Sequence, residues 1–289
     1  MNNPPNKPPG LFNIAPLLPP LPRLKIVDVG AMSLGDDSDV YSPLAAATPC
    51  DVYGFEPGGD EVTKLNASAK PGRHYLPYFI GDGSARTFYQ CNANMTSSLF
   101  EPNTSLLAKF QNLEELTRVV KTSEVETKRL DDIPELEGTD FLKTDVQGAE
   151  LMVFEGAARL LDHALVVHTE VQFVPLYKGV PLFGEIDIHL RSKGFSLHRM
   201  TQSGRTFKPL IFMNEINAAL SQILWGDAVY VRDFMQFDAL SGAALLKLAA
   251  ILHETYRSVD LAAYALAAYD RQNASNLQQA YIRKLAGQN

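Results

Sequence analysis

The stretch FLKTDVQGAELMVFEGA, residues 141–157, indicates the fold class of this chain. An apolar run ends in Lys143 and Asp145, Gly148 follows, and the apolar spacing of an amphipathic helix begins at once. A buried strand that turns directly into a helix is typical of an α/β protein. Because ligands of such proteins bind beyond the carboxyl ends of the strands, the charged residues at this strand end predict a functional site.

Strand-like and helix-like segments alternate on both sides of this stretch, which predicts an α/β fold with a mainly parallel, seven-stranded sheet. Helical patterns lie at residues 62–69, 106–116, 151–161 and 183–193, and Gly194 stands where a C-cap glycine belongs. The seven expected strands cover residues 24–30, 50–57, 73–81, 139–146, 164–173, 195–200 and 227–234.

The two ends of the chain differ in composition from this central part. Residues 1–23 are rich in proline, lack the charged-then-apolar order of a signal peptide, and are interpreted as an extended arm. Residues 24–234 are expected to form the main domain. Residues 235–289 carry Ala, Leu and Tyr at helical spacing and predict a C-terminal helical extension. We interpret its apolar stripe as a packing or homodimer element, with a lid or substrate-binding role as the alternative.

The composition restricts the class of partner. The formal net charge of -7 points away from nucleic acid, because a phosphate-binding surface normally needs a basic excess. No apolar run reaches the roughly 18 residues of a membrane helix, so no membrane span is expected. Two cysteines, Cys50 and Cys91, are too few for a disulfide framework and show no metal-ligand spacing. We therefore expect a cytoplasmic protein, and we predict no metal site.

The first expected strand ends in Asp28 and is followed by Gly30 and Ala31. A glycine after a strand lets the backbone approach a ligand closely, because a side chain there would collide with the ligand. The turn lacks the G-x-G-x-x-G fingerprint, and the next helix begins only towards Tyr41. A pyrophosphate cradle at a helix N-terminus is therefore poorly supported.

Acidic residues also end the next two expected strands. Glu56, followed by Pro57, has the position of a carboxylate that grips two ribose hydroxyls, and the alternative is a solvated turn. Asp82, followed by Gly83, could accept a hydrogen bond from an adenine amino group, and the alternative is a common Asp-Gly turn. Together the three strand ends suggest a nucleoside ligand. Ribose recognition without a pyrophosphate cradle suits S-adenosylmethionine better than NAD.

Four motifs, VDVGA, GFEP, GDGS and TDFLKTDVQGAELMVFEGA, resemble in order and spacing those of the FkbM-type methyltransferases. The resemblance runs from about Leu24 to Phe234 and is most specific in the last motif. Two parts of the sequence, the first loop and the last motif, depart from the family pattern. In the first loop, Met32 stands where Asn is common and the second glycine is displaced to Gly35, and in the last motif Gln147 replaces the usual glutamate.

This resemblance implies a class I methyltransferase fold, which is Rossmann-like, with seven strands and one antiparallel edge strand. It also implies S-adenosylmethionine as the cofactor and methyl transfer that is usually to oxygen. Methyl transfer is an in-line displacement on a sulfonium carbon. The protein must therefore chiefly align the acceptor and, for a hydroxyl, help to remove its proton.

In such an enzyme Asp145 is expected beside the sulfonium, where it orients an acceptor hydroxyl or serves as its base. Lys143 shares its face of the strand and is expected to pair with Asp145 or to contact an acidic substrate. Glu150, early in the next helix, is the alternative acid. His168 and Glu170 reach the neighbouring strand end. Glu170 could form a carboxylate pair with Asp145, whereas the alternative for His168 is a packed, hydrogen-bonded side chain.

Two irregular segments, residues 94–103 and 173–185, are expected to shape the acceptor site, with packed surface loops as the alternative. The sequence thus predicts an S-adenosylmethionine-dependent methyltransferase that acts on a hydroxyl of a small molecule, a sugar or a glycan precursor. Two other classes stay open: a non-catalytic scaffold protein of the same fold, and an oxidoreductase that binds NAD.

Overall fold

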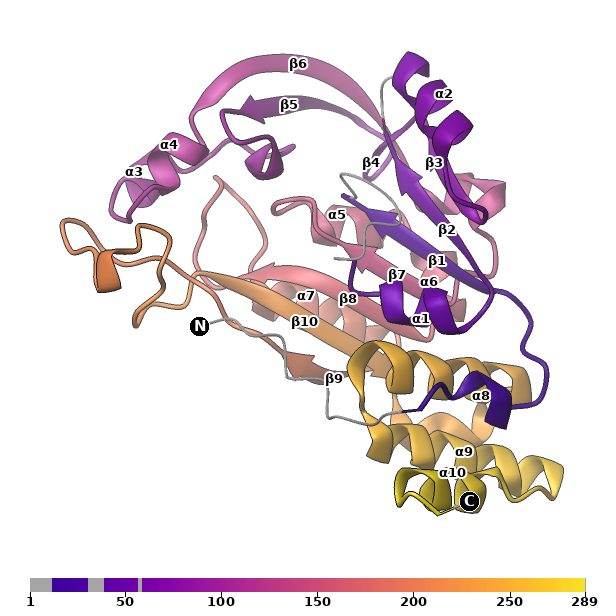
Figure 1. The fold of residues 1–289 in the computed structure, drawn as a ribbon. Coiled ribbons are helices and arrows are strands. Elements are labelled where there is room, and N and C mark those ends of the chain that lie inside the picture. The colour runs from indigo at the N-terminus through magenta and orange to yellow at the C-terminus, as the bar shows by residue number, and fades with distance from the viewer. Residues whose placement is uncertain (1–11, 31–38, 57–58, 289) are drawn as a thin grey trace. The chain divides into compact units, whose positions relative to one another are not determined.

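The computed structural model describes residues 12–30, 39–56 and 59–288 (Figure 1). Ala31, Met32, Gly35 and Pro57, which the sequence singles out, lie outside the described residues. The chain divides into two compact units, and the predicted domain boundaries after residues 23 and 234 stay predictions. The larger unit holds residues 25–30, 51–56 and 59–233, and the smaller one holds residues 12–24, 39–50 and 234–288.

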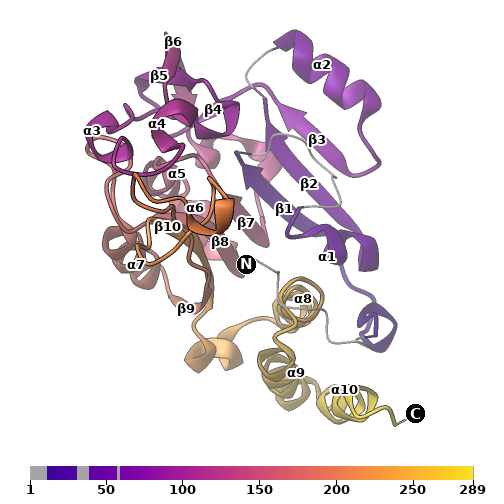
Figure 2. The same cartoon turned by 60° about the vertical axis from the view of Figure 1, so that its left-hand side comes forward.

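A seven-stranded sheet forms the centre of the larger unit, as the sequence predicts. Each strand is built from one of the apolar runs, and the expected bounds are close to the observed ones. Helix α2 (Gly59–Ser68) lies along the β3 edge (Figure 2). The strands are, in spatial order, β3 (Arg73–Leu76), β2 (Cys50–Phe55), β1 (Leu24–Val29), β7 (Phe141–Thr144), β8 (Val166–Gln172), β10 (Trp225–Arg232) and β9 (Phe195–Met200).

The antiparallel strand of this sheet is β10, which is not the edge strand that was expected. It pairs with β8 on one side and with β9 on the other, and both pairings are antiparallel. Helix α7 (Phe183–Ser192) carries the chain from β8 back across the sheet, so β9 runs parallel to β8. Strand β10 then occupies the position between them, one place in from the edge.

A second sheet of three strands differs from the prediction. It has the order β4 (Phe79–Ile80), β6 (Val119–Lys128) and β5 (Ala85–Cys91). The single strand expected at residues 73–81 was wrong, because the chain leaves the large sheet after Leu76. Pro77 follows directly and has no backbone N–H to donate to a ladder.

The helices of the larger unit are shorter than their apolar patterns predict. The helix expected at residues 151–161 is divided at Gly156. A Cβ atom there would lie 2.3 Å from the carbonyl oxygen of Gly81, so the division requires a glycine. The helix expected at 106–116 is likewise two short helices. Gly194 has the positive φ (80°) expected of a C-cap glycine after α7. The remaining helices are α3 (Thr104–Leu107), α4 (Leu113–Leu116), α5 (Glu150–Glu155) and α6 (Ala158–His163), with 3-10 turns at Asn94–Thr96, Leu130–Asp132, Pro134–Leu136 and Phe212–Asn214.

One face of the seven-stranded sheet packs against α5, α6 and α7. Val27, Leu142 and Val167, from three neighbouring strands, are fully buried there in one cluster with Phe154 and Ile186. Because side chains alternate between the two faces of a strand, the sequence neighbours of these residues point to the opposite face. That opposite face carries the charged residues, so the packing of the helices determines where a site can lie.

The smaller unit is helical at its C-terminal part, as predicted. Leu245, Leu248 and Leu252 of the predicted apolar stripe are fully buried. No helix among the described residues is long and apolar enough to cross a membrane. The helical elements of this unit are α1 (Ser42–Ala47), α8 (Gly242–Ile251), α9 (Val259–Asn273) and α10 (Leu277–Leu285), with a π-helical turn at Leu252–Tyr256 and 3-10 turns at Ala15–Leu17 and Phe234–Ala239.

Candidate active site

Two rows of polar residues cross the face of the sheet that α5 to α7 leave uncovered. In the first row Asp28 of β1 is in register with Lys143 of β7, and Lys143 is in register with His168 of β8. In the second row, two residues further along β8, Glu170 is in register with Asp227 of β10. Both rows lie towards the carboxyl ends of the parallel strands, where α/β proteins bind ligands.

Asp145 begins the turn that follows β7. Its backbone N–H donates to the carbonyl oxygen of Val29 at 2.9 Å, so the turn is fixed against the end of β1. Gly30 has a positive φ of 96°, and a Cβ atom there would lie 1.9 Å from the carbonyl oxygen of Asp145. The glycine is therefore required by the neighbouring strand end, which is a structural reason in addition to the expected approach of a ligand.

Lys143 pairs with Asp28, whereas the sequence led us to expect a pair with Asp145. The distance from Lys143 Nζ to Asp28 Oδ1 is 2.9 Å, and the Asp28 carboxylate is 1% exposed. The pairing follows from the sheet order, because β1 lies beside β7 and puts these two side chains in register. An ion pair this deeply buried fixes the ends of the two central strands relative to each other.

Gln147 connects the two carboxylates that the sequence proposes as a pair. Its Nε2 donates to Asp145 Oδ1 at 2.8 Å and to Glu170 Oε2 at 3.1 Å. The hydroxyl of Tyr177 lies 3.1 Å from Gln147 Oε1, and the hydroxyl of Ser98 donates to the Gln147 carbonyl oxygen at 2.7 Å. Both irregular segments expected at the acceptor site thus reach this network.

Sequence reasoning missed the role of Gln147 in this network. It noted the residue only as a departure from the family pattern, and that departure was the available signal. Asp227 was also missed, because its place opposite Glu170 depends on the insertion of β10 beside β8.

Two acids next to this network, the buried Glu150 and the partly buried Glu170, have raised pKa values. Glu150 is 2% exposed, and its Oε1 accepts hydrogen bonds from the backbone N–H groups of Val146 at 2.9 Å and Gly148 at 3.3 Å. Burial raises the pKa of Glu150 to about 7, against the effect of those donors. Burial, and then the charges of Asp145 and Glu150, raise the pKa of Glu170 well above its usual range.

His168 packs against Asp227 across the β8 and β10 pairing. Its Nε2 lies 3.8 Å from Asp227 Oδ1, and the His168 side chain is 13% exposed. Burial acts to raise the pKa of Asp227, but the adjacent His168 and the hydrogen bond from the Thr201 hydroxyl at 3.1 Å outweigh it, so the pKa of Asp227 is lowered. His168 is thus a mostly buried side chain beside a carboxylate, and its role stays a prediction.

The expected nucleoside contacts lie at the ends of β2 and β4. Glu56 follows β2 directly, is partly buried, and its backbone N–H donates to Leu76 O at 3.0 Å. Asp82 accepts from the Ser84 N–H at 3.0 Å and pairs with Arg86 at 2.5 Å. Burial acts to raise the pKa of Asp82, but these partners outweigh it and lower the pKa to about 2.

Gly83, next to Asp82, has a φ of +89°. This part of the chain therefore has the geometry of an Asp-Gly turn, the alternative that the sequence left open. An adenine amino group would have to share the Asp82 carboxylate with Ser84 and Arg86.

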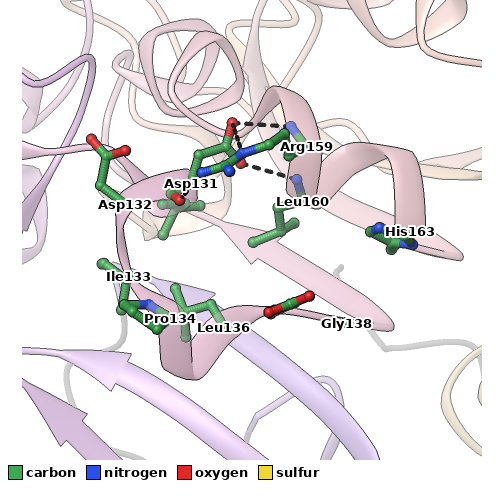
Figure 3. A pocket seen from close by; sticks show the side chains of 11 residues that line it. Asp131, Asp132, Ile133, Pro134, Leu136, Gly138, Arg159, Leu160 and His163 are labelled. Atoms are coloured by element: carbon green, nitrogen blue, oxygen red, sulfur yellow. Dashed lines mark hydrogen bonds and ion pairs between the residues drawn. The ribbon is translucent and has the colours of Figure 1, made fainter.

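A cavity of about 490 Å³ lies on another part of the larger unit (Figure 3). Its lining runs from Leu130 to Gly138, just before β7, and includes Arg159 of α6. It is therefore at the amino ends of the strands. Asp131 in this cavity already accepts from the backbone N–H groups of Arg159 and Leu160, each at 3.0 Å. We assign no function to it.

The sheet and the acidic residues at its carboxyl edge define a class I methyltransferase. A model of the methyltransferase FkbM domain matches residues 28–197, which is more than half of the chain. The chain therefore belongs to the FkbM methyltransferase family, and both the predicted family and the predicted fold class are confirmed. Within the described ranges, no group of three or more His, Cys, Asp or Glu side chains is arranged to hold a metal ion.

The chain is also similar to solved methyltransferase structures. One is the magnesium protoporphyrin IX methyltransferase from Synechocystis PCC 6803 with bound SAM, at 13% identity and a TM-score of 0.35, covering 73% of this chain and 71% of that chain. Another is an S-adenosylmethionine dependent methyltransferase from Mesorhizobium loti, at 12% identity and a TM-score of 0.33, covering 76% and 95%. No curated protein matches the chain.

Proposed function

We propose that this methyltransferase uses S-adenosylmethionine to methylate a hydroxyl oxygen of a small molecule, a sugar or a glycan precursor. The observation that carries the proposal is the carboxylate pair of Asp145 and Glu170, held at 2.8 Å and 3.1 Å from one amide nitrogen at the carboxyl edge of the sheet. Paired carboxylates bind hydroxyl groups, since each oxygen accepts a hydrogen bond. No cationic group separates the two, so an alcohol suits the pair better than an acid does.

The residues at the other strand ends fit the cofactor. Glu56 follows β2, next to the strand that ends at Gly30, and its carboxylate is suited to accept from two ribose hydroxyls. Gly30, with its positive φ, follows β1 at the same edge and lets the backbone come close to a ligand there. When bound, S-adenosylmethionine supplies an electrophilic methyl carbon, whose bond to sulfur breaks as the bond to the acceptor oxygen forms.

In this mechanism the chain's own residues orient the acceptor and take its proton. Asp145 accepts a hydrogen bond from the acceptor hydroxyl and so fixes its direction. Glu170 in its ionised form takes the hydroxyl proton, because a carboxylate whose pKa is raised is a stronger base than an ordinary one. Gln147 keeps both carboxylates in place, and the Asp28 and Lys143 pair holds β7, which Asp145 follows, against β1.

Calorimetric titration with S-adenosylhomocysteine, with NAD in a parallel titration, tests this proposal. Micromolar binding of S-adenosylhomocysteine alone is expected. Tighter binding of NAD would favour an oxidoreductase, and no binding of either would favour a scaffold protein. Transfer of labelled methyl groups to a panel of polyols, sugars and phenols then tests the acceptor class, and labelling of amines alone would contradict the assignment to oxygen.

A further inference from the structure

Gln147 is held in an unusual backbone conformation by four side chains. Its φ is +55°, a region that residues other than glycine seldom adopt and that costs free energy. The strain is compensated at both ends of the residue. Ser98 binds its carbonyl oxygen, Tyr177 approaches its Oε1, and Asp145 and Glu170 accept from its Nε2.

The surroundings determine which way the amide of Gln147 faces. Two carboxylates lie on one side, and only the NH2 group can donate to both of them. The Tyr177 hydroxyl lies on the other side, between Gln147 Oε1 at 3.1 Å and the Thr96 carbonyl oxygen at 3.0 Å, and donates there. Tyr177 is 2% exposed, so water does not compete for its hydroxyl, whereas Gln147 itself is partly buried.

The chemistry of the amide explains why a glutamine suits this place. An amide presents one hydrogen to each carboxylate and adds no charge. A glutamate there would add a third negative charge about 3 Å from the other two, and the three could coexist only by binding additional protons. The glutamine therefore lets Asp145 and Glu170 lie close together with fewer bound protons than a glutamate at this place would require.

We infer that Gln147 is a positioning residue for methyl transfer, which sets the spacing of the Asp145 and Glu170 carboxylates and the number of protons that the pair holds. This inference rests on the proposed function. Gln147 stands where the family usually has a glutamate. With a glutamine there, one carboxylate of the pair can give up its proton and act as the base. Among the described residues, the titratable groups that act on the pair are Glu150, Tyr177 and Asp227. Behind them, His168 and Lys143 act on Asp227, Asp28 pairs with Lys143, and Cys91 acts on Tyr177.

The first test measures the carboxyl pair without any ligand. Carbon-detected NMR of protein labelled at the glutamate carboxyl, assigned with Glu170→Gln, follows the titration of Glu170. Gln147→Met keeps the size of the side chain and removes both donors, and should move the midpoint up by about half a pH unit or more. Gln147→Glu also keeps the size but adds a charge, and should move it up by about one pH unit or more.

The control for added charge is Gln90→Glu, an exposed position on β5. It should leave the Glu170 midpoint unchanged. A merely steric role for Gln147 predicts equal midpoints in the wild type and in Gln147→Met, and that result would overturn the inference. Gln147→Glu shows how far one added charge at this place moves the midpoint, and a shift in Gln147→Met is judged against it.

The second test connects the pair to the cofactor. S-adenosylmethionine carries a positive sulfonium and S-adenosylhomocysteine does not, so the ratio of their Kd values reports the charge of the pair. In the wild type the preference for S-adenosylmethionine should increase as pH rises through the Glu170 midpoint. In Gln147→Glu this increase should occur at a higher pH, and an unchanged pH overturns the inference. Absence of binding by both ligands in the wild type would instead remove the proposed function, whatever the NMR titration shows.

Discussion

Asp28 and Lys143 form an ion pair across two adjacent parallel strands, with 2.9 Å between Oδ1 and Nζ and side chains 1% and 18% exposed. Removing one partner of a buried ion pair takes this counter-ion from the other, which typically costs about 3–5 kcal/mol. We therefore expect Lys143→Met to lower the free energy of unfolding by an amount in this range. Urea denaturation at pH 7 measures it.

The matched control for this prediction is the exposed pair of Lys178 and Glu101, 2.6 Å apart and 57% and 48% exposed. Lys178→Met should change the free energy of unfolding by less than about 1 kcal/mol, because water screens exposed pairs. The double variant Asp28→Asn with Lys143→Met should recover part of the loss. A double variant no more stable than Lys143→Met alone would show that the uncompensated charge is not the cause.

Glu150→Gln should stabilise the protein at high pH only. The pKa of Glu150 in the folded protein is about 7, against 4.5 for an ordinary glutamate, so the folded state binds more protons between these values. Wild-type stability therefore falls as pH rises from about 4.5 to about 7, and the variant does not share this loss. The expected advantage of the variant is about 2–3 kcal/mol at pH 8 and close to zero at pH 4.

Denaturation curves of both proteins between pH 4 and pH 8 check this prediction. The glutamine oxygen can still accept from Val146 and Gly148, so the hydrogen bonds of the turn are kept. Glu155→Gln, on the exposed side of the same helix, is the control and should show no such pH dependence. An advantage for Glu150→Gln that is equal at all pH values would contradict the assigned pKa shift.

Gly30→Ala should be far more destabilising than Gly138→Ala. Both glycines have positive φ, 96° and 73°, so both substitutions carry the backbone cost of about 1–2 kcal/mol. Only at Gly30 does the new Cβ meet another atom, the carbonyl oxygen of Asp145 at 1.9 Å, whereas nothing lies within 4 Å at Gly138. Thermal unfolding should show a much larger loss of Tm for Gly30→Ala, and equal losses would mean that the strand ends separate easily.

The large sheet was predictable from the sequence because its strands are buried, and burial leaves long apolar runs. Strands β5 and β6 escaped prediction for the opposite reason. Most of their side chains are exposed or half-buried, so a polar segment such as VVKTSEVETK shows no period of two. The end of β3 was mispredicted for another reason. The apolar run continues through Pro77, but the strand pairing of the backbone ends before it.

Most acidic members of the candidate site were predictable from the sequence, but Asp227, the role of Gln147 and the contacts within the site were not. Parallel strands end at one edge of a sheet, which was enough to bring Asp145 and Glu170 together. Which side chains touch depends on strand neighbours and register. Lys143 meets Asp28 because β1 lies beside β7, and Asp227 meets His168 because β10 enters next to β8. Neither adjacency follows chain order.

Glu56→Gln should weaken cofactor binding without affecting the fold. A carboxylate accepts from both ribose hydroxyls, whereas an amide offers one acceptor oxygen and a donor that opposes the second hydroxyl. We expect the Kd for S-adenosylhomocysteine to increase at least about tenfold, which is about 1.4 kcal/mol. Glu101→Gln, at an exposed position, should leave the Kd unchanged. Unchanged affinity in Glu56→Gln would remove the ribose assignment.

Substitutions in the carboxylate pair should separate binding from turnover. Glu170→Gln removes the proposed base and should lower kcat by about 100-fold or more, the usual contribution of general base catalysis. Asp145→Ala removes the group that orients the hydroxyl and should also lower turnover. In both variants the Kd for the neutral S-adenosylhomocysteine should stay within about threefold of the wild type, because neither residue is assigned a contact with it. Labelled methyl transfer and calorimetry on the same preparations measure the two quantities. Loss of S-adenosylhomocysteine binding in Glu170→Gln, with an unchanged Tm, would place Glu170 in the cofactor site and assign the proton transfer to another group.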